Sequence, residues 1–116
     1  MDRRDAVQEY YAAIDGGDYD RLRTLLAPGF VQERPDRTLD GRDRFVRFMR
    51  EERPRTDTEH VLTETCVSDE RDGAATVFVR GRLIADETAL FGFVDVHRIG
   101  DDGIESLTTY TAYSGD

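Results

Sequence analysis

The stretch from Val7 to Pro35 constrains the fold more than any other part of the sequence, because it predicts two amphipathic helices, a glycine turn between them and a short strand after them. Its apolar residues recur at the three- and four-residue spacing of one helix face: Val7, Tyr10, Tyr11, Ile14, Leu22, Leu25 and Leu26. Gly16 and Gly17 are expected to end the first helix, because glycine adopts the left-handed C-cap conformation without a steric cost. Asp18 is expected to cap the second helix. The apolar side of this helix pair must be covered by residues elsewhere in the chain.

The residues after the helix pair predict a strand end and a third helix. Residues 30–34 alternate and stop at a proline, which is typical of an edge strand or a strand end. Residues 36–40 are polar and predict a loop. Residues 42–53 predict a third helix, which the next proline would end. The buried stripe of this helix would consist of Phe45, Phe48 and Met49.

From residue 56 onward the pattern changes to strands. Four segments with period-two alternation are separated by short turns, namely residues 56–68, 74–85, 88–99 and 104–113. Hairpin connections predict an antiparallel meander, because parallel strands need crossovers of about a dozen residues or more. Helices followed by strands predict an α+β fold, in which three N-terminal helices pack in a strongly curved, mostly antiparallel sheet and leave a conical cavity. We expect a single domain over residues 1–116.

Two of the predicted strands carry apolar side chains on both faces. Val77 and Val79 fall on one face of the first of these strands, and Phe78 and Ile84 fall on the other. An antiparallel sheet usually turns one face to water. A second apolar face in a small domain therefore predicts a homodimer that forms through the sheet.

The charge of the chain restricts its partners. The sequence has 25 acidic residues against 16 basic ones, all of them arginine, and a formal net charge of −9. This composition is typical of a salt-adapted protein, because concentrated salt screens self-repulsion. A GC-rich genome also replaces lysine with arginine, so both explanations stay open. A duplex nucleic acid is not an expected partner, because phosphate neutralisation needs a positive field.

The same composition bears on location and cofactors. No apolar run reaches 18 residues, so no membrane span is expected. The charged N-terminus lacks the apolar core of a signal peptide, which predicts a cytoplasmic protein. Cys66 is the single cysteine, which excludes an internal disulfide and a multi-cysteine metal site. We predict neither a metal nor a cofactor.

The segment VQEYYAAIDGGDYDRLRTLLAPGFVQERP resembles the nuclear transport factor 2-like superfamily, more narrowly its ketosteroid isomerase and SnoaL-like polyketide cyclase branch. The segments DGRDRFVRFMRE and FGFVDVHRIGDDGIESLTTY are similar to that branch too, so the resemblance covers nearly the whole chain. It implies an internal cavity for a small apolar, carbonyl-bearing molecule and acid–base chemistry of the isomerase or cyclase type. The superfamily also hosts non-enzymes, so the alternative is a non-catalytic module that binds an anionic metabolite or serves for dimerisation.

The resemblance also implies roles for individual residues. The isomerases hold a dienolate with a helix tyrosine and a protonated sheet aspartate, while a second carboxylate moves the proton. These positions correspond to Tyr10, Asp95 and Arg34 in this sequence. A guanidinium cannot act as a general base, and losing that base removes about 10²–10⁴-fold in rate. Steroid isomerisation by the family mechanism is therefore not expected here.

The residues around Asp95 suggest their own acid–base chemistry. Asp95 lies within an apolar run, so its carboxyl must be paired, hydrogen-bonded or protonated. His97 shares its strand face, and an imidazole beside a carboxylate can transfer protons near neutral pH. The candidate catalytic residues are Tyr10, Asp95 and His97, while Tyr11 is expected to be core. Core packing for Tyr10 and His97, and a structural ion pair or hydrogen bond for Asp95, remain the alternatives.

A second set of residues is predicted to bind the ligand. In the family's register, the strand face with Phe78, Arg80 and Arg82 turns toward the cavity. Arginines at a cavity mouth suit a carboxylate or phosphate. The candidate ligand-binding residues are Arg34, Phe78, Arg80 and Phe93. For the arginines, pairing with the abundant acidic residues is the alternative.

Overall fold

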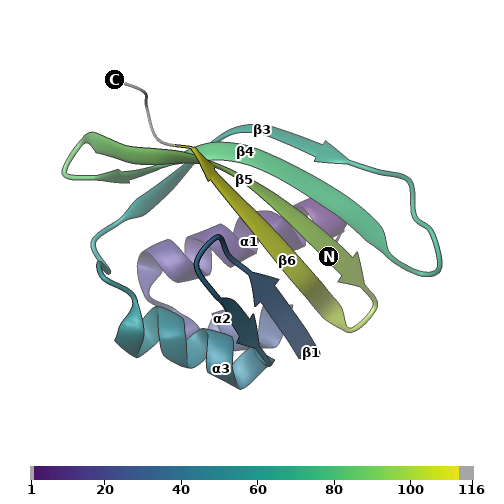
Figure 1. The fold of residues 1–116 in the computed structure, drawn as a ribbon. Coiled ribbons are helices and arrows are strands. Elements are labelled where there is room, and N and C mark those ends of the chain that lie inside the picture. Colours follow the sequence, from purple (N-terminus) through teal and green to yellow (C-terminus); the bar gives the residue numbers. More distant parts are fainter. Residues whose placement is uncertain (1, 113–116) are drawn as a thin grey trace.

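The computed structural model describes residues 2–112 and places three N-terminal helices against one face of a six-stranded, curved and unclosed sheet (Figure 1). The predicted α+β fold is confirmed. The helical elements are α1 (Arg3–Gly16), α2 (Tyr19–Leu25), α3 (Arg42–Arg47) and the π-helical turn η1 (Phe48–Glu52) that continues α3. The strands are β1 (Leu26–Glu33), β2 (Thr38–Asp40), β3 (Glu59–Val67), β4 (Ala75–Ala85), β5 (Thr88–Gly100) and β6 (Gly103–Ala112). Tyr113, which the sequence predicts in the last strand, lies outside the described residues.

The first two helices end and begin where local sequence predicts. Gly17 has a left-handed conformation with φ of 70°, and its N–H donates to the carbonyls of Ala13 and Ile14. The side chain of Asp18 accepts a hydrogen bond from the N–H of Arg21 at the start of α2. This sharp connection lets the apolar sides of both helices meet the same core. In the described part of the chain, no helix is long and apolar enough to cross a lipid bilayer.

The strand order is β2-β1-β6-β5-β4-β3. Strands β3 to β6 form the predicted antiparallel meander. Of the two alternatives predicted for residues 30–34, the strand end is correct, because β1 ends at Glu33. The edge strand is wrong, because β1 pairs with β2 on one side and in parallel with β6 on the other. The predicted loop at 36–40 contains β2. Pro28 is tolerated inside β1 because it falls in the irregular stretch between the paired residues Leu26 and Val31.

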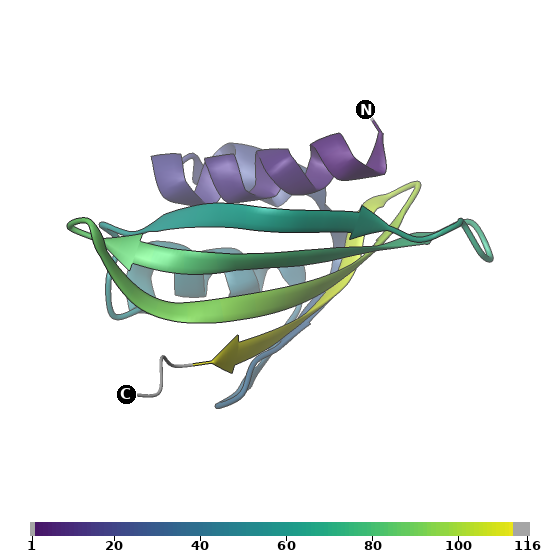
Figure 2. The same ribbon diagram turned by 90° about the horizontal axis from the view of Figure 1, so that it is seen from above.

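The sheet bends over the helices, as the view from above shows (Figure 2). Register shifts interrupt the ladders of β3 with β4, β4 with β5 and β5 with β6, and such bulges increase local bending. Gly81 lies at a crowded point of β4, where an added Cβ would collide with the carbonyl of Val61 and the ring of Phe93. The absent side chain therefore lets β3 and the Phe93 ring approach the β4 backbone.

The two faces of the sheet differ sharply in burial. On the inner face, which meets the helices, Val77 and Val79 are fully buried. On the outer face, Phe78 and Tyr110 are exposed to 44% and 58%. We define the outer face as the side of β4, β5 and β6 that carries Phe78, Arg80, Val94 and Tyr110.

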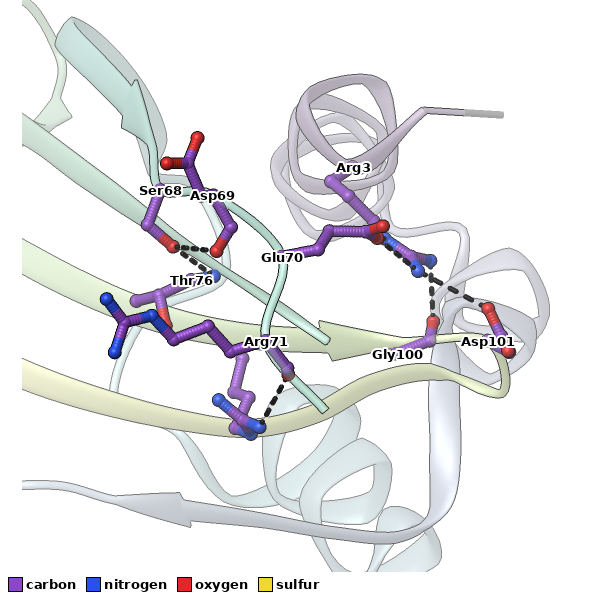
Figure 3. Close-up of polar contacts among 9 residues, drawn as sticks. Arg3, Ser68, Asp69, Glu70, Arg71, Thr76, Gly100 and Asp101 are labelled. Carbon is purple, nitrogen blue, oxygen red and sulfur yellow. Dashed lines mark hydrogen bonds and ion pairs between the residues drawn. The ribbon is translucent and has the colours of Figure 1, made fainter. Parts of the chain in front are cut away.

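Arg3 of α1 forms hydrogen bonds to residues at the end of the sheet near the N-terminus (Figure 3). Its guanidinium donates to the Glu70 carboxylate (3.0 Å), to the Gly100 carbonyl (2.8 Å) and to the Asp101 carboxylate (3.3 Å). These three acceptors belong to two different hairpin turns, so one side chain ties the helix to both. The turn between β3 and β4 is also held internally, because the Ser68 hydroxyl accepts the Thr76 N–H (3.0 Å).

Candidate functional site

A cavity of about 260 Å³ lies between the helices and the inner face, toward the end of the sheet away from Arg3. Its apolar wall consists of Ile14, Pro35, Phe48, Met49, Pro54, Leu83, Leu90, Phe91 and Phe93. Its polar wall consists of Tyr10, Gln32, Arg34, Arg53, Arg55, Thr58, His60, Asp95, Thr109 and Thr111. This size lies just below the usual range for drug-sized ligands. A small, mostly apolar molecule with a few polar atoms therefore fits its dimensions and lining.

Asp95 of β5 borders this cavity and is only 4% exposed. One carboxyl oxygen accepts a hydrogen bond from the Tyr11 hydroxyl and the other accepts one from the Thr109 hydroxyl, both at 2.6 Å. Burial raises the pKa of Asp95, while the hydrogen bonds from Thr109 and Tyr11 act in the opposite direction. The carboxyl is thus fixed in position and is easier to protonate than an exposed aspartate.

Behind Asp95, Tyr11 connects the carboxyl to His97. The Tyr11 hydroxyl oxygen lies 2.8 Å from Nε2 of His97. Burial lowers the pKa of His97 to about 3, so this imidazole is neutral at pH 7. The Tyr11 hydroxyl has one hydrogen, which it uses in the hydrogen bond to Asp95. It must therefore accept the hydrogen bond from His97, so we assign the histidine proton to Nε2. Nδ1 then carries only a lone pair, which agrees with its lack of a hydrogen-bond partner within residues 2–112.

The structure separates the two adjacent tyrosines. Tyr10 borders the cavity together with Asp95, and its hydroxyl has no hydrogen-bond partner in the described region. Burial raises the pKa of Tyr10, so the phenol is neutral and able to donate. Tyr11 is in the core, as predicted, yet it also holds Asp95 and His97. Neighbouring positions on a helix point about 100° apart, and the sequence gives no sign of which tyrosine meets which strand.

His97 does not border the cavity. Its side chain is fully buried, and its Nε2 atom is occupied by Tyr11. The prediction that His97 shares a strand face with Asp95 is correct, since both are on the inner face with Phe93. Any contribution of His97 to chemistry in the cavity passes through Tyr11.

Arg34 also borders the cavity, at the position where the resemblance implies a carboxylate. Its Nη1 donates to the Gln32 side-chain oxygen (3.3 Å), and the Gln32 amide donates to the Thr109 hydroxyl (3.0 Å). Thr109 in turn donates to Asp95, so hydrogen bonds join the guanidinium to the carboxyl. Gln32 and Thr109 were not predicted. They meet because β1 and β6 pair in parallel, which the local sequence does not signal.

The Arg34 guanidinium lies over the Phe48 ring, 4.9 Å from its centre, a cation–π contact. Its Nε is buried and has no hydrogen-bond partner among residues 2–112. The nearest carboxylate oxygen belongs to Asp36, 3.7 Å away, too long for a hydrogen bond. A buried donor without an acceptor is costly, so Arg34 offers the cavity a cationic group with spare hydrogen-bonding capacity.

The prediction that the strand face with Phe78 and Arg80 turns toward the cavity is wrong. Both lie on the outer face, and Arg80 pairs there with Glu64 at 2.8 Å. Strand alternation identifies two faces without saying which one meets the helices, and choosing the other parity moves every side chain across the sheet. Phe93 has the opposite parity, is 5% exposed and borders the cavity.

Comparisons with known proteins agree with this fold. A family model described as the SnoaL-like domain matches residues 7–106. No curated protein sequence matches the chain. Among solved structures, a protein of unknown function from Cytophaga hutchinsonii, described as NTF2-like, is 15% identical, with 96% of this chain and 90% of that chain covered and a TM-score of 0.74.

Two further structures widen the comparison. A candidate ketosteroid isomerase from Kribbella flavida is 20% identical, with 97% of this chain and 79% of that one covered and a TM-score of 0.71. The orange carotenoid protein of Anabaena, bound to canthaxanthin, is 19% identical with a TM-score of 0.81. The match covers 94% of this chain but only 36% of the carotenoid protein. At these identities the likeness shows the fold alone.

Proposed function

The chain belongs to the SnoaL-like domain family, and we propose that it binds a small, largely apolar molecule with a carbonyl group in the cavity and acts on it by acid–base chemistry of the isomerase or cyclase type. The observation that supports this most is the placement of two hydrogen-bonding groups on one apolar cavity. The Tyr10 hydroxyl has no partner within residues 2–112, and the Asp95 carboxyl is held by two hydrogen bonds.

The proposed chemistry uses neutral donors in a site of low polarity. Burial raises the pKa of both Tyr10 and Asp95, which favours their protonated forms. Two such donors would stabilise negative charge that develops on a carbonyl oxygen when a neighbouring carbon loses a proton. Tyr11 and Thr109 would keep the Asp95 carboxyl oriented, so that little reorganisation is needed during the reaction.

Arg34 supports a second candidate function, the binding of an anionic metabolite without catalysis. Its side chain borders the cavity and its buried Nε lacks a hydrogen-bond partner in the described chain, so a carboxylate in the cavity would meet a guanidinium with unused donors. Guanidinium suits this role because it matches the planar geometry of a carboxylate and stays charged. The two candidates use opposite ends of the same hydrogen-bonded chain from Arg34 to Asp95.

A matched pair of ligands separates the two functions. Cyclohexanone and cyclohexanecarboxylate share a ring and differ in the polar group, and their binding can be measured by ligand-observed NMR at millimolar concentration. If the first function is correct, the ketone binds the wild type, while Tyr10→Phe and Asp95→Asn weaken its binding by about tenfold. If the second is correct, the carboxylate binds better and Arg34→Gln removes that preference.

Arg80→Gln on the outer face is the control and should change the binding of neither ligand. If the ketone binds equally well to the wild type, to Tyr10→Phe and to Asp95→Asn, the first function is wrong.

We further propose that two copies of the chain pair through the outer face. Phe78, Val94 and Tyr110 are exposed to 44%, 37% and 58%, and they lie on the neighbouring strands β4, β5 and β6. Val94 is paired directly with Tyr110, and Phe78 with Val96, which is two residues from Val94 on the same face of β5, so the patch is continuous. Contiguous exposed apolar surface is typical of an interaction site.

Light scattering should give the mass of a dimer for the wild type. The double variant Val94→Thr/Tyr110→Ser should give a monomer that remains folded. A wild-type monomer at 100 µM would refute the pairing.

We also propose that the protein is cytoplasmic and salt-adapted, and its acidic composition supports the salt adaptation. With a net charge of −9 per chain, both the fold and any dimer suffer self-repulsion that salt would screen. The melting temperature and the dimer fraction should both rise between 0.1 and 2 M KCl. A fall in both would count against salt adaptation.

A further inference from the structure

We propose that His60 and Asp15 supply the general base of this site, with His60 as the catalytic residue and Asp15 as a positioning residue. The inference rests on the proposed function, because it assigns the proton-transfer group that Arg34 cannot provide. His60 is at the start of β3 and borders the cavity. Asp15 lies near the C-terminal end of α1.

The contact between these residues fixes the tautomer of the imidazole. The Asp15 carboxylate accepts the backbone N–H of His60 at 2.9 Å, and its other oxygen lies 2.6 Å from Nδ1 of the ring. A carboxylate offers only lone pairs, so the ring proton is assigned to Nδ1, which donates it to Asp15. Nε2 of the neutral ring then carries a lone pair and can accept a proton. A base oriented by a third group in this way is the arrangement that activates histidine in many enzymes.

The surroundings of His60 leave its Nε2 available. Nε2 has no hydrogen-bond partner within residues 2–112 and is not among their fully buried unpaired atoms. The ring is packed between Tyr11, at 5.1 Å between centres, and Phe93, at 5.5 Å in an edge-to-face contact. The side chain keeps 16% of its exposure. His60 is therefore oriented by Asp15 and two aromatic rings, while its basic nitrogen stays reachable.

The two histidines of the chain contrast in this respect. His97 is fully buried and its Nε2 contacts Tyr11, so it has no free nitrogen toward the cavity. His60 and Asp95 border the same cavity, from β3 and β5 respectively. A bound ketone could therefore meet a base at His60 and donors at Asp95 and Tyr10.

The proposed reaction needs no co-reactant. Nε2 of His60 takes a proton from a carbon next to the carbonyl, and the C–H electron pair becomes the C=C bond of an enolate. The carbonyl oxygen gains the negative charge and accepts hydrogen bonds from Tyr10 and Asp95. The imidazolium is paired with the Asp15 carboxylate. If the ketone carries a C=C bond between its β and γ carbons, the enolate is a dienolate, and return of the same proton to the γ carbon completes an isomerisation with atoms and charge balanced.

A probe reaction reports such a base directly. 5-Nitrobenzisoxazole opens when a base removes its ring C–H proton: the C–H electrons form the nitrile and the N–O bond breaks, giving a coloured cyanonitrophenolate. We expect the wild-type chain to show saturable turnover. His60→Gln should lower kcat by about 10²-fold or more with KM changed less than threefold. Asp15→Asn should lower kcat on the order of tenfold, because it removes the charge that stabilises the imidazolium. Arg80→Gln on the outer face should match the wild type.

A merely structural pair would behave differently. In that case His60→Gln and Asp15→Asn would lower the melting temperature but leave kcat within twofold, which would overturn the proposal. His60→Ala should regain turnover when free imidazole is added, and a structural role would not give that rescue. Diethyl pyrocarbonate offers a test without a variant: mass spectrometry should find modification of His60 and not of buried His97, with loss of turnover in step.

The outcomes also separate this inference from the proposed function. If cyclohexanone binds and depends on Tyr10 and Asp95, but the probe is not turned over or is turned over equally by His60→Gln, the base assignment is wrong and the binding function stands. If neither the ketone nor the probe is bound, both fail.

Discussion

The inner and outer faces of β4, β5 and β6 are built from alternating residues of the same strands, yet they handle polar groups in opposite ways. On the inner face, Asp95 is 4% exposed and accepts two hydrogen bonds of 2.6 Å. On the outer face, Arg80 and Glu64 form an ion pair of 2.8 Å with side chains 70% and 61% exposed. Similar distances therefore have different consequences, because water screens the outer pair and not the inner one.

Apolar side chains on the two faces also differ in burial. Val77 and Val79 are fully buried on the face that packs against the helices, whereas Phe78 on the same strand is 44% exposed. The inner face should therefore determine the stability of the single chain and the protonation of the site. The outer face should matter only for association. The predictions below test this division from the largest expected effect to the smallest.

The largest effect is expected from pH, through His97. Its pKa is about 3 in the folded chain and about 6.5 when unfolded, so between these values the unfolded state binds more protons. Stability should fall by roughly 5 kcal/mol as pH drops from 6.5 to 3. Asp95 acts in the opposite direction, because its raised folded pKa adds stability as pH falls. Urea unfolding from pH 7 to 4 should show a smaller loss for His97→Gln and a larger one for Asp95→Asn. Identical slopes in all three proteins would contradict the burial of both groups.

The next largest effect separates the two tyrosines. Tyr11→Phe removes the hydroxyl between Asp95 and His97 and leaves two buried groups short of a partner, so it should cost about 2–3 kcal/mol of unfolding free energy. Tyr10→Phe removes a hydroxyl with no partner in the described chain and should cost less than about 1 kcal/mol. Equal costs in chemical denaturation would show that Tyr11 is not the residue that holds Asp95.

A smaller difference is expected between neighbours on β4. Val79→Ala should destabilise the monomer by about 2 kcal/mol, because it leaves a void against the helices. Phe78→Ala, which deletes a larger side chain, should cost under about 1 kcal/mol at concentrations where the chain is monomeric. Thermal unfolding at low micromolar concentration measures both. A larger loss for Phe78→Ala would reverse the assignment of the two faces.

The smallest effect concerns the outer ion pair. At concentrations where the chain is monomeric, Arg80→Gln should change the unfolding free energy by less than about 0.5 kcal/mol, and the difference should vanish in 1 M NaCl. Glu64→Gln is the matched partner and should behave alike. In the monomer, a cost above about 1 kcal/mol that persists in high salt would contradict the exposure of this pair to water.

Features that depend on neighbouring residues could be predicted from the sequence. The left-handed cap at Gly17 and the side-chain cap at Asp18 follow from local backbone preference. The hairpins of the meander follow from short turns. The need of Asp95 for hydrogen bonds followed from its apolar neighbours, since a bare buried carboxylate is too costly.

Features that depend on tertiary pairing could not be predicted. The choice of Tyr11 rather than Tyr10 as the partner of Asp95 depends on how α1 is rotated against the sheet. The parity of β4, which placed Phe78 and Arg80 outside, depends on which face the helices cover. The contact of Asp15 with His60 joins residues far apart in sequence, and neither residue alone indicates it.

The central claim is that the inner cavity, and not the outer face, receives a small ketone. The most direct measurement uses intermolecular nuclear Overhauser effects between cyclohexanone and the methyl groups of the ¹³C-labelled protein. Contacts are predicted to Ile14, Met49 and Leu83, which border the cavity. Contacts to Val94 on the outer face, with none to those three residues, would contradict the claim.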